Sequence, residues 1–384
     1  MFERVFQSIM RTARKFIKFT VPVVFYDSLD FAKFIMEKGV KKPLIVTGNS
    51  IHNKHNLTRS LIRSLDDLGL TAVVFSDAEV NPTVKQAVFV AEFYRQNGCD
   101  GIIGFGGGSA MDLAKAAACI VSHPDIPLCK LRGMLKVKKV NVPIFAVPTT
   151  AGTGSETTIC AVVTDSENKD KYAINDPVLT PIAALLDAKL TLSLSPSLTA
   201  QTGMDALTHA VEAFVGRSGT KESDGYAVKA IKAIFANLEK ATKDGDDYQA
   251  RKNMLTASFD AGIAFSRAYV GYVHALAHAL GGYYNMPHGL CNAVLLPYVL
   301  KAYGESAKKK LDVLAAEIGE KDFIDALVRL SASVGIPEKL HIKAADADEI
   351  ASHAAKEANP LYPVPEIFGK ERLKEILLQA VEVE

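Results

Sequence analysis

A regular alternation over the first half of the chain, from Pro22 to about Asp187, constrains the fold most strongly. Short runs of β-branched and other apolar residues alternate there with longer segments whose apolar residues recur at helical spacing. The runs predict strands at 21–26, 44–47, 72–75, 101–105, 144–147 and 182–186, and the segments predict helices near 55–68, 84–96 and 110–122. Strands that alternate with helices form βαβ units. The sequence therefore predicts an α/β domain with a parallel sheet, which binds its ligand at the carboxyl ends of the strands.

The second half of the chain has a different pattern, which starts after the Ser-rich segment 192–199. Helical spacing dominates, and no convincing strand signal interrupts it. The predicted helices cover 197–215, 224–241, 248–267, 271–280, 306–318, 322–334, 346–357 and 370–381. We therefore expect two domains, an α/β domain over residues 1–193 and an all-α domain over residues 194–384, with the ligand site in the cleft between them.

Composition narrows the class of protein. The 384 residues are 48% hydrophobic and 23% charged, with a formal net charge of +1, which argues against nucleic acid as a partner. No apolar run approaches the length of a membrane span. Five scattered cysteines without CxxC spacing favour a reducing compartment, so we expect a cytoplasmic protein. The first twenty residues are basic and apolar and could form a membrane-surface helix or a transit peptide; a short helix packed on the domain is favoured.

A glycine-rich run follows the predicted strand 101–105 and leads into a predicted helix that begins near Ala110. Gly106, Gly107 and Gly108 would let the backbone approach a pyrophosphate, and the helix N-terminus would supply free N–H groups. The dinucleotide fingerprint GxGxxG is not met, because Ser109 stands at the position of its third glycine. A purely structural turn is the alternative.

A second polar cluster, PTTAGTGSE at 148–156, follows the next predicted strand. The hydroxyls of Thr149, Thr150 and Thr153 could bind phosphate, ribose or the nicotinamide amide. An ordinary Ser/Thr/Gly turn is the alternative.

Three histidines are grouped in one stretch of the second half. His274 and His278 are four residues apart, which places them on one face of a helix. Gly281-Gly282 and Pro287 are helix breakers that would let the chain fold back, so that His288 approaches the same space.

Asp205 and His209 have the same four-residue spacing on an upstream helix. One carboxylate and several imidazoles in apolar surroundings suit a divalent ion such as Fe(II), Zn(II), Ni(II) or Mn(II). A lone buried histidine is more often a hydrogen-bonded core residue. Burying this many polar groups without partners would be costly, which favours a metal site.

The runs GMDALTHAVEAF (203–214) and HALAHALGGYYNMPHG (274–289) resemble the two metal signatures of the iron-dependent, group III alcohol dehydrogenases. The similarity extends over nearly the whole chain. It implies Asp205, His209, His274 and His288 as metal ligands, and it leaves His278 beside the metal as a catalytic residue.

The resemblance also implies cofactor contacts. The family uses the GGGS-x-x-D run for the pyrophosphate and the threonine cluster to line the cofactor. Lys171 aligns with a lysine that reaches the ribose, and Asn81 with a position near cofactor and substrate. NAD-preferring members carry an aspartate in place of Gly48, so this chain has room for a 2′-phosphate. The predicted cofactor contacts are Gly48, Asn49, Ser50, Asn81, Gly106, Gly107, Gly108, Ser109, Asp112, Thr149, Thr150, Thr153 and Lys171.

These features predict a metal-dependent oxidoreductase. It would interconvert a small primary alcohol or diol and its aldehyde by hydride transfer to or from NAD(P). We expect activity with both cofactors and a modest preference for NADP. Glycerol-dehydrogenase-like polyol oxidation, a lyase similar to the dehydroquinate synthases and a non-catalytic metal-binding protein are the alternatives. The strand at 21–26 is apolar and comes first in the chain, which makes it a plausible sheet edge, and we expect it to pair in a homodimer.

Overall fold

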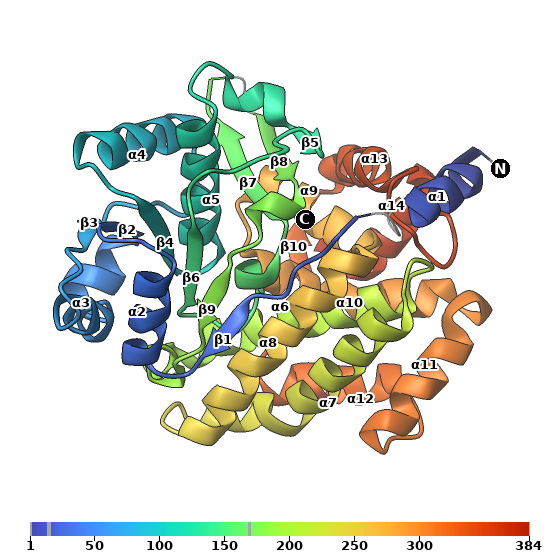
Figure 1. Cartoon of the computed structure of the whole chain (residues 1–384). Helices are drawn as coiled ribbons and strands as arrows, with labels where there is room; N and C mark the ends of the chain where they lie inside the picture. Colours follow the sequence, from blue (N-terminus) through green and yellow to red (C-terminus); the bar gives the residue numbers. More distant parts are fainter. Residues whose placement is uncertain (1, 14–16, 168–169, 384) are drawn as a thin grey trace. The chain divides into compact units, whose positions relative to one another are not determined.

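The computed structural model describes residues 2–13, 17–167 and 170–383 (Figure 1). Two compact units are resolved: residues 18–193 form one, and residues 194–384 form the other together with the N-terminal helix α1 (Phe2–Ala13). The sequence-based expectation had put α1 in the first domain. Hydrogen bonds explain the difference, because Arg4 donates to the carbonyls of Val364 and Pro365, each at 2.7 Å. Residues 14–16 of the basic segment lie outside the described residues.

A six-stranded sheet forms the centre of the first unit. Its order is β1-β9-β6-β4-β2-β3, and all the pairings are parallel. The strands are β1 (Val23–Phe25), β2 (Pro43–Val46), β3 (Val73–Phe75), β4 (Gly101–Gly106), β6 (Ile144–Pro148) and β9 (Ala183–Leu185). All six coincide with predicted strands. The parallel α/β fold is thereby confirmed, and β1 is an edge strand, as expected.

Helices cover both faces of this sheet (Figure 1). Side chains alternate between the faces, since Leu44 packs with α4 (Val84–Gln96) and α5 (Gly108–Ser122), whereas Ile45 packs with α2 (Ser28–Glu37) and α3 (Arg59–Asp66). Each fully buried aliphatic side chain contributes roughly 1.5–3 kcal/mol. α2 was not predicted.

A smaller sheet in the same unit was also missed. Strands β7 (Cys160–Asp165) and β8 (Asp170–Asn175) are antiparallel, and the two-residue β5 (Gly133–Met134) pairs in parallel with β8. Their exposed positions carry polar residues and their buried positions pack under α5, which gave no continuous apolar run to recognise.

The second unit is helical. It contains α6 (Pro196–Val215), α7 (Lys221–Lys243), α8 (Tyr248–Ala268), α9 (Tyr272–Tyr284), α10 (His288–Tyr303), α11 (Glu305–Ile318), α12 (Phe323–Ser333), α13 (Ala347–Ala358) and α14 (Lys370–Gln379).

Two features of this unit correct the prediction. The expected helical C-terminal domain is confirmed, but β10 (Leu340–Ile342) and β11 (Val381–Val383) form a two-stranded parallel sheet that was not predicted. The central residues of these strands, His341 and Glu382, are polar, so neither strand is a continuous apolar run that could be recognised. α10 was also missed, because it contains Pro297 and is apolar on most of its surface.

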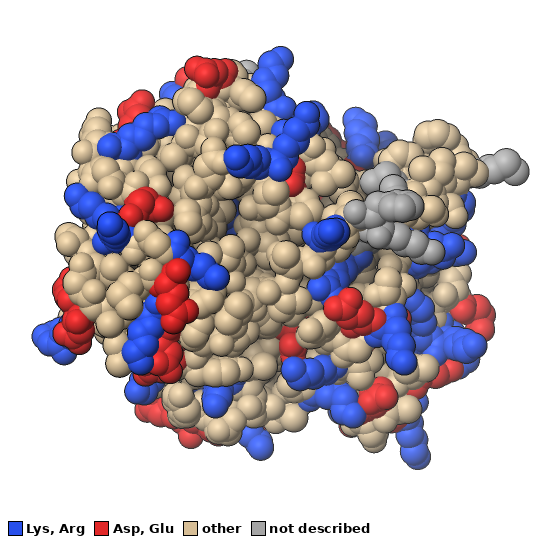
Figure 2. All heavy atoms as spheres, in the orientation of Figure 1, with Lys and Arg blue, Asp and Glu red and all other residues tan. Residues whose placement is uncertain are grey.

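No helix among the described residues is both long and apolar enough to cross a membrane. On the face drawn in Figure 2, basic and acidic side chains are interspersed.

Candidate metal centre and nucleotide site

Helix α6 supplies the first two candidate ligands. Ser195 caps its N-terminus by accepting from the Leu198 N–H, and Pro196 occupies the first turn, where a missing N–H costs nothing. Asp205 and His209 lie one turn apart on its buried face, with 3% and 6% of their surfaces exposed. The predicted four-residue spacing therefore brings both side chains to the same place.

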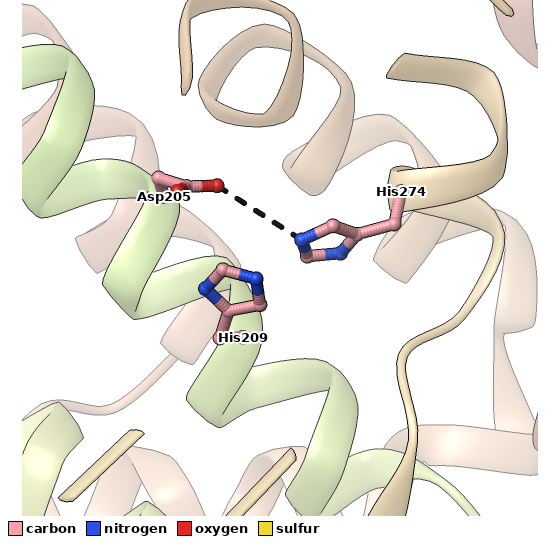
Figure 3. Close-up of side chains that lie close together, drawn as sticks. All are labelled: Asp205, His209 and His274. Carbon is pink, nitrogen blue, oxygen red and sulfur yellow. Dashed lines mark ion pairs between the residues drawn. The ribbon is translucent and has the colours of Figure 1, made fainter. Parts of the chain in front are cut away.

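His274, in the first turn of α9, completes a compact group with these two residues. The ligand atoms of Asp205, His209 and His274 all lie within 4.8 Å of one another. In Figure 3 the carboxylate and both rings converge from α6 and α9, and Nε2 of His274 lies 3.9 Å from Oδ1 of Asp205. The two imidazole rings stack, with centroids 4.4 Å apart. Helices far apart in sequence thus bring three metal-binding side chains together.

His288 lies beside this group at the start of α10. Its Nε2 is 3.4 Å from Oδ1 of Asp205, and Nδ2 of Asn292 is within hydrogen-bond distance of both atoms, at 3.0 and 2.7 Å. The chain turns back at Asn285, which adopts the left-handed conformation (φ 51°). Gly281-Gly282 were expected to break the helix; they lie inside α9 instead. His288 nevertheless reaches the space that we expected.

The buried nitrogen of His274 fits a metal ligand. Its Nε2 has no hydrogen-bond partner among the residues that the structure describes, while its Nδ1 lies 2.6 Å from Oε2 of Glu212. Burial, reinforced by the neighbouring histidines, holds the pKa of His274 well below its usual range, so the ring is neutral at physiological pH. A neutral imidazole with a free lone pair beside a buried carboxylate is the donor set that a divalent cation requires.

Glu212 was missed by the sequence analysis. It sits on α6 one turn after His209, and its side chain is 3% exposed. Burial raises the pKa of Glu212 to about 7. The N–H groups of Gly271 and Val273, together with His274, act in the opposite direction, because they favour the charged form. A buried acid at helical spacing from two candidate ligands was the available signal.

His278 lies outside the compact group. Its side chain is 43% exposed, and its ring stacks on that of His288 with centroids 5.1 Å apart. Nδ1 of His278 is 2.7 Å from Oε1 of Glu357, which also accepts from the Tyr362 hydroxyl at 2.7 Å. Burial alone would raise the pKa of Glu357, but His278 and Tyr362 hold that pKa below its usual range. Glu357, on α13, was also missed.

In the first unit, the two predicted cofactor motifs meet at the carboxyl ends of β4 and β6. Gly106 has φ 154°, and a Cβ on Gly108 would lie 3.0 Å from Cγ2 of Thr153. A Cβ on Gly107 would lie 3.4 Å from Oγ1 of Thr150. The Thr149 N–H donates to the Gly106 carbonyl at 3.0 Å. The glycines therefore allow a close approach of the two loops, and α5 begins at Gly108 with its N–H groups open to a phosphate.

Three further predicted cofactor residues also come together. Asn81 has a left-handed backbone (φ 57°), and its N–H lies 3.3 Å from Oγ of Ser109. Lys171 on β8 donates to Oδ1 of Asn81 at 2.9 Å. Gly48, Asn49 and Ser50 follow β2, where a π-helix (Ser50–Lys54) begins.

Asp112 has a different environment from the one expected. Both of its oxygens are used inside the protein: Oδ1 accepts from the Ser155 hydroxyl at 2.9 Å, and Oδ2 from the Val162 N–H at 3.2 Å. Lys115, one turn further along α5, is fully buried, and its Nζ lies 2.7–3.2 Å from oxygens of Ser155, Thr158 and Cys160. Burial raises the pKa of Asp112 and lowers that of Lys115. This buried pair, whose lysine was missed, fixes the loop that carries the threonine cluster.

Comparisons with known proteins identify the family to which the chain belongs. The sequence model of the C-terminal part of the Fe-containing alcohol dehydrogenase family matches residues 199–381, and the model described as iron-containing alcohol dehydrogenase matches residues 26–188. Alcohol dehydrogenase 4 of Saccharomyces cerevisiae is 38% identical over 91% of this chain and 94% of its own length. The NAD-dependent methanol dehydrogenase of Bacillus methanolicus is 36% identical over 82% of this chain and 86% of its own.

Among solved structures, a 1,3-propanediol oxidoreductase superposes with a TM-score of 0.90 at 34% identity, covering 95% of this chain and 99% of that one. The relatives cover almost the full length at identities well above those at which only the fold is shared. The chain therefore belongs to the iron-containing alcohol dehydrogenase family, and it is an alcohol dehydrogenase.

Proposed function

We propose that this enzyme interconverts a small primary alcohol or diol and its aldehyde, with hydride transfer to or from NAD(P) and with a divalent ion, Fe(II), held by Asp205, His209, His274 and His288. The observation that carries the proposal is the buried group on α6 and α9, in which Nε2 of His274 has no hydrogen-bond partner among the described residues. Zn(II) could occupy the same donor set, because it binds nitrogen and oxygen ligands more tightly than Fe(II) does.

The chemistry divides between the bound groups and the chain. Fe(II) supplies a Lewis acid that lowers the pKa of a substrate hydroxyl, and the nicotinamide supplies the hydride-transfer chemistry. The chain holds the ion with one carboxylate and three neutral imidazoles, so that the net charge of the centre stays positive and favours an anionic substrate oxygen. The ligands thus set both the position and the charge of the centre.

His278 is the proposed proton carrier. Glu357 pairs with its Nδ1, and the 43% exposure of the side chain gives the imidazole access to water, with which it would exchange a proton. The ring of His278 stacks on that of His288, which keeps His278 beside the metal centre although it is not one of the proposed ligands.

The nucleotide is proposed to bind at the carboxyl ends of the parallel strands. Gly106, Gly107, Gly108 and Ser109 would hold the pyrophosphate at the start of α5, and Thr149, Thr150 and Thr153 would line the cofactor. Asn81 and Lys171, joined by their hydrogen bond, would reach the ribose. Asp112 would act indirectly, by holding the loop that carries the threonines.

Named relatives bear on the substrate. One acts on methanol and one on 1,3-propanediol, as their names state. Dehydrogenation of small alcohols or diols is therefore favoured over a lyase of the dehydroquinate-synthase kind. Glycerol-like polyols remain among the substrates to be assayed.

A direct assay tests the function. Protein prepared without oxygen is freed of metal, reloaded with Fe(II) or Zn(II), and mixed with NAD or NADP and a series of primary alcohols and diols. We expect the absorbance of reduced nicotinamide to rise only with a metal present. Turnover that is independent of metal, or an absence of turnover with every alcohol and diol at full metal loading, would contradict the proposal.

We also propose a homodimer and a cytoplasmic location. β1 is a sheet edge whose Val23 is 47% exposed, and an edge of this kind requires pairing or cover. Pairing of two copies of β1 across a two-fold axis would provide it. A light-scattering mass equal to one chain at micromolar concentration would exclude the dimer, and cell fractionation would test the location.

A further inference from the structure

One carboxylate, that of Glu212, connects the two helices that carry the compact group. Its Oε2 accepts from the Gly271 N–H at 2.8 Å and lies 2.6 Å from Nδ1 of His274; its Oε1 accepts from the Val273 N–H at 2.8 Å. Glu212 belongs to α6, as do Asp205 and His209, whereas its three donors belong to the start of α9. A single side chain therefore ties the α6 ligands to the α9 ligand.

The start of α9 depends on this contact. Its N-cap residue, Gly271, has no side chain to satisfy the first free N–H groups of the helix, and Glu212 accepts from two of them instead. The approach is close, because a Cβ on Gly271 would lie 2.7 Å from Oε1 of Glu212. The glycine is thus needed where the carboxylate enters.

The same carboxylate determines where His274 carries its proton. Both oxygens of Glu212 accept from backbone N–H groups, which favours the ionised carboxylate. That form only accepts hydrogen bonds, so the ring nitrogen 2.6 Å away is Nδ1–H. Neutral imidazole then has its lone pair on Nε2, the atom that points toward Asp205. If the proton were on Nε2 instead, the ring could not bind a metal from that side.

We propose that Glu212 is a positioning residue for the metal centre: it fixes the Nδ1–H form and the ring orientation of His274, and thereby sets the metal affinity. This inference rests on the proposed metal site. It differs from a purely structural role, in which Glu212 would cap α9 and affect stability alone.

The first experiment measures the wild-type protein and uses a variant only for signal assignment. The metal-free wild-type protein is labelled with ¹⁵N at its histidine rings, and the His274 signals are assigned with the His274→Gln variant. The ring ¹⁵N shifts distinguish the two neutral forms. We expect the proton of His274 on Nδ1; a proton on Nε2 would overturn the inference whatever any variant does.

The second experiment measures metal affinity. Glu212→Gln removes the charge and leaves at least one of the three N–H donors facing the amide NH2 group. We expect Zn(II) affinity, measured by competition with a chromogenic chelator, to fall tenfold to a hundredfold, as is usual when the partner of a metal-binding histidine is removed. The proportion of the Nε2–H form of His274 should rise. An affinity within twofold of the wild type would refute the inference.

Two further variants separate positioning from stability. Gly271→Ala keeps the carboxylate but forces it away from α9, and it should lower metal affinity in the same direction even if Glu212→Gln does not fold. Asp322→Ala removes the N-cap of α12, where Asp322 accepts from the Asp325 N–H at 2.9 Å; it should lower the melting temperature and leave the affinity unchanged. A wild-type protein that binds no metal would instead refute the proposed function, with the position of the His274 proton still measurable.

Discussion

Replacing the buried lysine of α5 should destabilise the nucleotide-binding unit severely. Nζ of Lys115 is fully buried and lies within hydrogen-bond distance of the carbonyls of Ser155, Thr158 and Cys160, at 2.7, 3.0 and 3.0 Å. Lys115→Met keeps the length and shape of the side chain but removes the ammonium donor that these carbonyls share, and it removes the cation that most favours the charged form of Asp112.

The expected loss follows from these contacts. Removing one partner of a buried charge pair costs about 3–5 kcal/mol, and each buried group left unsatisfied costs about 1–3 kcal/mol. The methionine avoids the desolvation that lowers the pKa of Lys115, which offsets part of this loss. We therefore expect the free energy of unfolding to fall by about 3–5 kcal/mol. For a unit the size of residues 18–193, this corresponds to a melting temperature lower by about 6–20 °C.

Urea and thermal unfolding followed by circular dichroism measure this change. Lys189→Met, at an exposed lysine of the same unit, is the matched control and should stay within about 0.5 kcal/mol of the wild type. In a double-mutant cycle, Asp112→Asn should couple to Lys115→Met by about 0.5–3 kcal/mol. A Lys115→Met protein within about 1 kcal/mol of the wild type would refute the argument that this pair fixes the threonine loop.

Three other predictions concern cofactor choice, pH and the histidines. Gly48→Asp should swing kcat/KM strongly toward NAD(H), because a Cβ there meets only the Ala78 carbonyl, at 3.4 Å, and the new charge repels a 2′-phosphate; a wild-type preference for NAD(H) above tenfold would contradict our reading of Gly48. Burial raises the pKa of Glu156 from 4.5 to about 7, so between these pH values the folded protein holds a proton that the unfolded chain has released. The free energy of unfolding should therefore fall as the pH rises from about 4.5 through 7. Glu156→Gln should flatten that part of the urea-unfolding pH profile and be more stable by about 3 kcal/mol above it; an unchanged slope would show that Glu156 is ionised when folded. Elemental analysis should find metal lost from His288→Ala and retained by a slow His278→Ala, and the opposite result would reverse our assignment.

Local pattern was sufficient to predict the central sheet. Its central strands β2, β4, β6 and β9 are buried on both faces and are continuous apolar runs, and the edge strands β1 and β3 are short apolar runs too. The elements that were missed lack such a pattern: β7 and β8 mix polar and apolar residues, and α10 carries apolar residues on most of its surface. Helix α1 was assigned to the wrong unit because its partners, at 362–365, lie at the other end of the chain.

Some residues of the candidate site could likewise be predicted from local sequence, and others could not. Asp205 and His209 were predictable because a helix places residues four apart on one face, and the glycine-rich turn because backbone must approach a phosphate closely. The contacts of Glu212 with His274 and of Glu357 with His278 were not, since they span 62 and 79 positions of sequence and only the packed helices bring the partners together. Lys115 was missed because lysine is rarely fully buried, and only its tertiary partners explain it.

Crystals grown without oxygen in the presence of Fe(II) would test the central claim most directly, through anomalous diffraction at the iron edge. We predict one strong peak in each chain, bonded to Asp205, His209, His274 and His288, with Nδ1 of His274 still on Glu212 and His278 beyond bonding distance. A peak bonded to His278 in place of His288, or no peak near α6 and α9, would contradict the account.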